Sequence, residues 1–176
     1  LHPRDRRQRQ MCIRDRDSQE WCEAIRYSPC EKFLAFASHD NNLYVYSVSD
    51  DGAYTLYKSF AKHNSFITAF DWSADSKYIR TVCGAYEKLY FNIPDKTHDS
   101  AGLSNTKETV WATGTVKLGW DVNGAHPSGE DGTHINQMQV SPDKSLVVSC
   151  DDWGLVNVFN YPVVDLTHQS KSYSGH

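Results

Sequence analysis

Three segments of the sequence align without a gap on a serine, at positions 28, 73 and 141. An apolar residue stands five positions after each serine: Phe33, Tyr78 and Leu146. An aromatic residue stands eighteen positions after each serine: Tyr46, Phe91 and Phe159. Self-similarity of this kind is typical of repeat architectures, so we expect successive copies of one structural unit.

Each copy is predicted to contain short β-strands. Its first strand alternates apolar and polar residues, a period of two that marks a half-buried strand. Ser-Pro or Ser-Ala-Asp then favours a turn. Second strands are expected over residues 33–37, 78–82 and 146–149, third strands over 43–48, 88–93 and 155–161, and a fourth strand over 54–60. Helical spacing is not sustained, so the predicted fold is all-β, with each copy forming one blade of a β-propeller.

The spacing of the serines divides the chain into blades. The first period is 45 residues and the second is 68, so the second copy carries about 23 extra residues. We expect blade 1 over residues 18–62, blade 2 over 63–131 with a long insertion at about 94–131, blade 3 over 132–172, and the start of a next blade at 173–176. Propellers close with roughly four to eight blades, so about three blades predict an incomplete ring.

Charge is unevenly distributed along the chain. Residues 1–17 hold six Arg and three Asp, a net charge of +3, whereas the remaining residues hold a net charge of -7. We expect residues 1–17 to be disordered. They are either a basic tail for acidic partners or a non-native segment, because residues 11–16 resemble peptides translated from sequencing-adapter DNA. The acidic body argues against nucleic acid as the main partner, because binding phosphates requires clustered Lys and Arg.

Membrane insertion and metal binding find little support in the sequence. No run approaches the roughly 18 apolar residues that a membrane span needs. The five cysteines are odd in number and form no C-x-x-C pair, which favours reduced thiols in the cytosol over disulfides or a zinc site. Histidines 39, 63, 134 and 176 recur near blade turns and are expected to brace strands. Asp121-Val122-Asn123-Gly124 is expected to form a tight turn rather than a calcium loop. We predict no cofactor, no metal and no catalytic residue, because no known catalytic motif is present.

Three stretches of the chain, over residues 62–78, 111–127 and 131–162, resemble one known family. They are similar to the carboxy-terminal propeller of the echinoderm microtubule-associated protein-like family, whose blades are degenerate WD repeats. The long insertion from Trp111 to Pro127 is the most specific part, and the resemblance covers about residues 20–176. The chain departs from the family pattern at His126, His134 and Cys150, where Trp, Asp and Gly are usual.

The resemblance implies a pair of atypical propellers that bind tubulin or microtubules in the cytoplasm. A generic WD-repeat scaffold of a ciliary or ubiquitin-ligase assembly is the alternative, because fold alone does not decide function. Microtubule surfaces are acidic and would repel an acidic body. We therefore expect this chain to be mainly structural, unless a local basic patch, shape complementarity or a further propeller provides contact.

Candidate partner-binding residues are expected in the loops. They are Trp120, His126, Asp151, Asp152 and Trp153, which lie in predicted turns, where binding residues gather on a rigid scaffold. Two interpretations remain open for them. The paired carboxylates either bind a basic partner or cap a turn, and the tryptophans at 111 and 120 either contact a partner or hold the insertion on the propeller. Trp72 alternates inward and is expected in the core.

Overall fold

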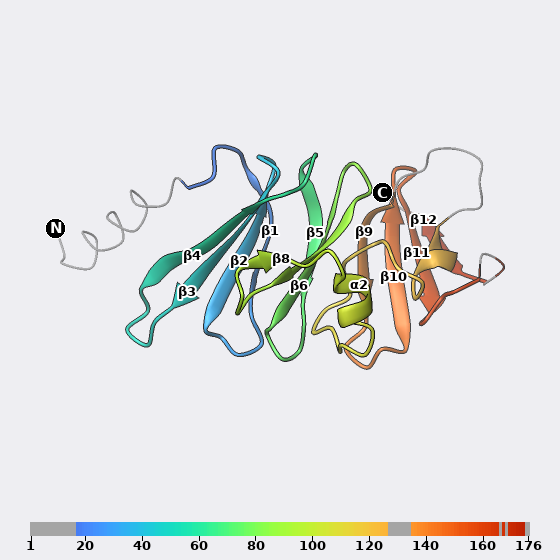
Figure 1. Ribbon diagram of the computed structural model, residues 1–176. Helices are drawn as coiled ribbons and strands as arrows, with labels where there is room; N and C mark the ends of the chain where they lie inside the picture. Colours follow the sequence, from blue (N-terminus) through green and yellow to red (C-terminus); the bar gives the residue numbers. More distant parts are fainter. Residues whose placement is uncertain (1–16, 127–134, 166, 168, 175–176) are drawn as a thin grey trace, which may run out of the picture.

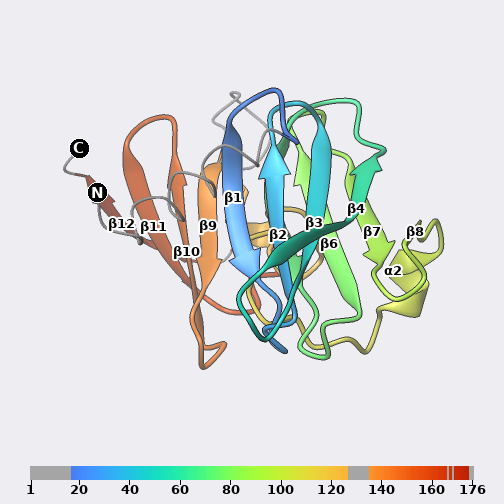
Figure 2. The same cartoon turned by 90° about the vertical axis from the view of Figure 1, so that its left-hand side faces the viewer.

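Three four-stranded antiparallel sheets stand side by side in chain order (Figure 1). The computed structural model describes residues 17–126, 135–165, 167 and 169–174. Figure 2, which looks onto the first sheet, shows the other two sheets behind it. The fold is therefore all-β and propeller-like without closing into a ring, which confirms the prediction made from the repeat.

The strands of each sheet follow one another in sequence. The first sheet contains β1 (Cys22–Tyr27), β2 (Phe33–Ser38), β3 (Asn42–Val48) and β4 (Tyr54–Ala61). The second contains β5 (Ile67–Trp72), β6 (Tyr78–Cys83), β7 (Lys88–Asn92) and β8 (Thr97–His98). The third contains β9 (Ile135–Val140), β10 (Leu146–Asp151), β11 (Leu155–Asn160) and β12 (Lys171–Ser174). The helical elements described are α2 (Gly102–Asn105) and the 3-10 helix η1 (Asn123–Ala125).

The repeated serine closes the first hairpin of every sheet in the same way. In the second sheet, the N–H of Ser73 donates to the carbonyl of Tyr78 at 2.9 Å, and the Oγ of Ser73 accepts from the N–H of Tyr78 at 2.8 Å. Ser28 and Ser141 make the equivalent pairs of bonds to Phe33 and Leu146. The third residue after each serine has a positive φ: Glu31, Ser76 and Lys144. The spacing of five thus reflects one turn geometry used three times.

The aromatic residue eighteen positions after each serine also occupies the same place in each sheet. Tyr46, Phe91 and Phe159 pair with the second residue of the preceding strand, which is Leu34, Ile79 and Val147 respectively. All three aromatic side chains are buried. The predicted equivalence of the three copies is therefore confirmed in strand register as well as in spacing.

The first and second sheets pack directly on each other. Trp72 on β5 is 1% exposed and lies in a cluster with Phe70, Leu43 and other apolar side chains of both sheets, as the sequence predicts. The Nε1 of Trp72 donates to the carbonyl of Arg26 at 3.4 Å, and Nη1 of Arg26 donates to the carbonyl of Phe70 at 2.7 Å. The polar groups of Trp72 and Arg26 therefore form hydrogen bonds between β5 and β1.

The second and third sheets pack with the help of the long insertion. Val116 lies in a buried cluster with side chains of β5 and β6, whereas Val122 and Ala125 pack on the third sheet. The N–H of Val140 donates to the carbonyl of Gly114 at 3.0 Å. A Cβ at position 114 would lie 2.5 Å from the side chain of Val140, so this close approach requires glycine. The extra residues of the second copy thus fill the joint between two sheets.

The ends of the second and third copies differ from the expected boundaries. Strand β8 is only Thr97–His98 and lies inside the segment assigned to the insertion. Tyr173 and Ser174, expected at the start of a next blade, instead pair with Val156 and Leu155 as part of β12. An edge strand exposes unpaired N–H and C=O groups, and residues 171–174 pair with those of β11. Residues 1–16 and 175–176 lie outside the described residues, so the expectations placed on them stay untested.

Removing one serine hydroxyl should destabilise its hairpin. We expect Ser73→Ala to lower the free energy of unfolding by about 1–3 kcal/mol, because the N–H of Tyr78 loses its side-chain acceptor at a buried serine. Ser100→Ala, at an exposed position, should change it by less than about 0.5 kcal/mol. Urea unfolding of both variants provides the measurement, and equal effects would show that the repeated serine is not a structural anchor.

Candidate functional site

A buried carboxylate on β5 holds the insertion in place. The side chain of Asp71 is fully buried. Its Oδ1 accepts from the Oγ1 of Thr113 at 2.6 Å and from the N–H and Oγ1 of Thr115, each at 2.9 Å. Its Oδ2 accepts from the N–H of Val116 at 3.1 Å. One side chain of the second sheet therefore fixes the path of residues 113–116.

Arg80 on β6 neutralises this carboxylate. Its Nε and Nη2 lie 3.0 and 2.9 Å from Oδ2 of Asp71, and Arg80 is only 7% exposed. The indole ring of Trp111 lies over the guanidinium, with the ring centroid 4.6 Å from Cζ. A buried ion pair is tolerated when its remaining polar groups are also hydrogen-bonded, as those of Asp71 are. Trp111 thus holds the insertion on the propeller, which is one of the two roles considered for it.

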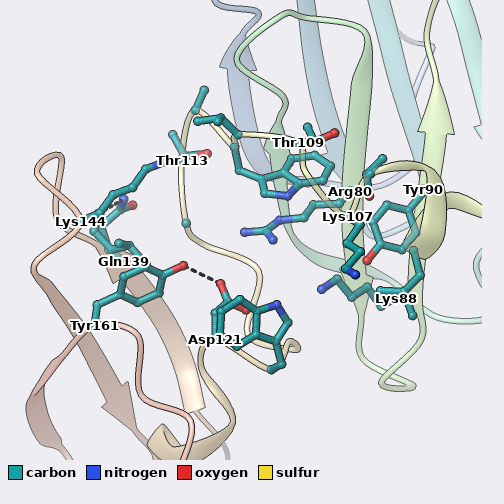
Figure 3. Close-up of a pocket in the computed structure, with 18 of the residues that line it drawn as sticks. Arg80, Lys88, Tyr90, Lys107, Thr109, Thr113, Asp121, Gln139, Lys144 and Tyr161 are labelled. Atoms are coloured by element: carbon teal, nitrogen blue, oxygen red, sulfur yellow. Dashed lines mark hydrogen bonds between the residues drawn. The ribbon is translucent and has the colours of Figure 1, made fainter.

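A cleft of about 650 Å³ opens between the second sheet, the insertion and the third sheet. Figure 3 shows Arg80 in its centre, Lys88, Tyr90 and Lys107 on one side, and Lys144 and Tyr161 on the other. The second sheet supplies Arg80 and Lys88, whereas Lys107 follows α2 and Lys144 lies in the turn between β9 and β10. The cleft therefore exists only when the insertion lies against both sheets.

The cleft is basic although the chain is acidic. Among the described residues, four cationic side chains line it (Arg80, Lys88, Lys107 and Lys144) against one lining carboxylate, that of Asp121. With the carboxylate of Asp71, which pairs with Arg80, the net charge is +2. The whole chain has a net charge of -4. The structure therefore contains a local basic patch, which is one of the three features expected to allow contact with an acidic surface.

Lys88 is the most perturbed cation of the cleft. Its Nζ donates to the carbonyl of Leu118 at 2.5 Å. Burial, and secondarily the nearby Arg80, lower the pKa of Lys88 from 10.5 to about 8, while Asp121 and Asp71 act in the opposite direction. The amine is therefore close to its titration point slightly above neutral pH.

Asp121 is tied to the third sheet. The hydroxyl of Tyr161 donates to Oδ2 of Asp121 at 2.6 Å, and the N–H of Val163 donates to the carbonyl of Asp121 at 2.9 Å. Burial and this carboxylate raise the pKa of Tyr161 well above its usual value. The residues that follow form the 3-10 helix η1, so the tight turn predicted at this segment is confirmed.

The structure does not bring the five predicted site residues together. Trp120 is 71% exposed and lines the basic cleft. His126 lines a separate cleft of about 530 Å³, and its Nε2 lies 2.7 Å from the carbonyl of Lys117. The turn at 151–154 lines neither of these two clefts. Of the five candidates, Trp120 alone lines the basic cleft.

Asp151 and its two neighbours differ in exposure. The Oδ1 of Asp151 accepts from the N–H groups of Trp153 and Leu155, both at 3.0 Å. This is the turn-capping role that the sequence analysis considered for the paired carboxylates. Asp152 is exposed and Trp153 is 70% exposed, so these two remain available to a partner.

The four cations of the cleft were not predicted as site residues. Arg80 and Lys88 lie in segments expected to be strands, and a charged side chain among apolar strand neighbours is the signal that could have drawn attention to them. Lys107 and Lys144 carry no such signal, because exposed lysines are common. Only the fold shows that all four lie around one cleft.

His63, Cys83 and Glu87 form the group of described residues whose side chains could ligate a metal ion. One ligand atom of each lies within 4.8 Å of the others. Protein contacts already use several of these groups. Nε2 of His63 is 2.6 Å from Oγ1 of Thr81, and Glu87 accepts from the N–H of Asn64 at 3.1 Å. Nδ1 of His63 lies 3.7 Å from Glu87 without a hydrogen bond. We interpret the cluster as bracing the connection between β4 and β5 against β6 and the turn between β6 and β7, the role expected for this histidine.

His39 is 3.0 Å from Glu23 and stacks on Trp21, which is again a bracing contact, while His134 and His176 lie outside the described residues. The cysteines within the described ranges, at positions 22, 30, 83 and 150, are free thiols. In the same part of the chain, no helix has the length and apolar character needed to cross a membrane.

Comparisons with known proteins identify relatives of this chain. The family model for the second β-propeller of echinoderm microtubule-associated proteins matches residues 4–176. The ciliary WD repeat-containing protein ctxp80 of Euplotoides octocarinatus is 50% identical over 146 residues, which are 83% of this chain and 20% of that protein. Echinoderm microtubule-associated protein-like 1 of Rattus norvegicus is 41% identical over 161 residues, which are 91% and 20% of the two chains. The solved structure of U3-55K is 14% identical, covers 92% of this chain and 41% of its own, and has a TM-score of 0.45. This chain spans about a fifth of the length of the curated relatives it matches.

Removing the carboxylate of Asp71 should release the insertion. We expect Asp71→Ala to lower the free energy of unfolding by about 3–5 kcal/mol, because it leaves Arg80 buried without its counter-ion. Asp95→Ala, at an exposed position, should cost less than about 0.5 kcal/mol. Thermal unfolding and limited proteolysis within residues 107–121 measure the effect. A stable Asp71→Ala variant with an uncleaved insertion would contradict the role given to this carboxylate.

Acid should weaken the fold through His63. Burial lowers the pKa of His63 below 6.5, although Glu87 opposes the shift. The unfolded chain therefore binds a proton more readily than the folded chain, and stability falls as pH drops below about 6.5, by at most about 1.4 kcal/mol per pH unit. The effect is measured by the thermal midpoint at pH 7.5 and 5.0. His63→Gln should show a smaller difference between these midpoints than the unsubstituted protein; an equal difference would refute the assignment to His63.

Proposed function

The chain belongs to the echinoderm microtubule-associated protein family, and from this premise we propose that it is a protein-binding propeller module of a microtubule-associated protein. The match of the family's second-propeller model to residues 4–176 is the observation that carries the proposal. The resemblance predicted from the sequence is thereby confirmed at the level of the family. Binding of tubulin or microtubules, and a location on the cytoskeleton, are the finer part of the proposal.

The three-sheet architecture supports a binding role rather than a catalytic one. WD-repeat propellers present loops and clefts on a rigid scaffold, and partners bind to these loops. The basic cleft supplies a surface of the sign needed against an acidic partner such as a microtubule. We therefore place the contribution of this chain at the cleft, while the sheets and the Asp71 network act as its support.

A scaffold in a ciliary assembly is the second candidate function. The relative that is 50% identical to this chain carries the name of a ciliary WD repeat-containing protein. Cilia are built on microtubules, so the two proposals differ in the immediate partner rather than in the cellular structure. Recovery of the tagged protein on isolated axonemes, compared with purified microtubules of equal tubulin content, separates them.

The five turn residues named from the sequence are not expected to form the microtubule contact. The full-length protein should pellet with microtubules. We expect a variant with Trp120, His126, Asp151, Asp152 and Trp153 all changed to Ala to retain an affinity within about threefold, because four of the five residues lie outside the basic cleft. A co-sedimentation series in tubulin concentration gives the affinity, and the thermal midpoint of the variant serves as the folding control. Abolished pelleting with an unaltered thermal midpoint would instead make these residues the contact surface.

A further inference from the structure

Two cations at the floor of the cleft have donor groups for which the described part of the chain provides no acceptor. Nε and Nη2 of Arg80 bind Asp71, but within the described ranges Nη1 has no hydrogen-bond partner. The ammonium of Lys88 has three N–H donors, and the carbonyl of Leu118 is the one acceptor found for it in the same part of the chain. Both groups line the cleft. Cationic donors in such a position are most stable when an anion completes their shell.

Two further cations extend the basic surface to the rim. Lys107 and Lys144 are both exposed. Figure 3 shows Lys107 on the side of Lys88, Lys144 on the opposite side, and Arg80 between them. The positive charges are therefore spread across the cleft and do not converge on a single point.

The spread of charge indicates the kind of anion. A single phosphate group would be held by donors that converge on it, whereas carboxylates spaced along a peptide match separated cations. A long nucleic acid would also meet the acidic body, whose net charge outside residues 1–17 is -7. The aromatic side chains of Trp111, Tyr90 and the exposed Trp120 add apolar walls suited to the stems of peptide side chains.

We propose that this cleft binds an Asp- or Glu-rich peptide segment of a protein partner, with carboxylates on Arg80 and Lys88 at the floor and on Lys107 and Lys144 at the rim. The inference deepens the proposed function, because it names the chemical class of partner that the module binds. Its physical basis is charge complementarity between a local basic surface and an acidic chain, in a protein whose surface is otherwise acidic.

Binding should depend on pH near the titration point of Lys88. A carboxylate beside the amine favours its charged form, so the peptide should bind more tightly at pH 7 than at pH 9. Arg80, Asp71, Asp121 and Tyr90 are the other charged or titratable groups close to Lys88. Burial raises the pKa of Tyr90 above its usual value of 10.

The test uses the full-length protein and a fluorescein-labelled peptide of ten glutamates. Fluorescence anisotropy should show saturable binding that weakens with added salt, while a peptide of ten glutamines should not bind. Lys107→Glu combined with Lys144→Glu should weaken binding at least tenfold. Lys32→Glu combined with Lys58→Glu changes the net charge equally, at exposed positions of the first sheet, and should weaken binding less than twofold. Both pairs lie at exposed positions, and their thermal midpoints should match that of the unsubstituted protein.

Three results would overturn the inference. They are the absence of glutamate-peptide binding, an equal loss of affinity in the two paired variants, and displacement of the peptide by tripolyphosphate at concentrations below those of unlabelled peptide. Co-sedimentation of the same variants separates this inference from the proposed function. Peptide binding by a protein that does not pellet with microtubules would refute the proposed function and leave the cleft assignment intact. Pelleting with microtubules without any peptide binding would refute the cleft assignment and leave the proposed function intact.

Discussion

The hydrogen bonds of the Asp71 carboxylate determine how the second and third sheets are joined. Because the carboxylate is fully buried, each of its lone pairs needs a donor, and the insertion supplies these donors from residues 113–116. The same carboxylate holds the guanidinium of Arg80 at the floor of the cleft. One interaction therefore orders the insertion, places Val116 in the core and positions Arg80 in the lining of the cleft.

The repeated hairpin could be predicted because it depends on local geometry. A serine five residues before the next strand closes the same turn in all three copies, so its spacing in the sequence carries the structural information. The burial of Trp72 was also predicted, but strand alternation did not predict that its neighbour Asp71, on the opposite face of β5, is buried as well. The strand that ends the third sheet was not predicted, because nothing local distinguishes Tyr173 as a partner of β11 from the first strand residue of a further blade.

The cleft could not be predicted, because it arises from contacts between residues far apart in the sequence. Asp71 and Thr115 are separated by 44 residues, and no periodicity links them. Turn position did indicate exposed side chains correctly at Trp120 and Trp153, but it could not show that these residues lie apart. Lys107 and Lys144 look like ordinary surface lysines until the insertion lies between the sheets and brings them to opposite rims of one cleft.

Amide hydrogen exchange at Thr115 and Val116 tests most directly whether the buried carboxylate organises the joint between the sheets. Both N–H groups donate to Asp71 and lie outside regular strands. They should exchange as slowly as the paired amides of β5 and β6, because their opening requires the buried ion pair to separate. Exchange as fast as that of the exposed Asp152 amide would show that the carboxylate does not hold the insertion in solution, and would contradict this account of the cleft.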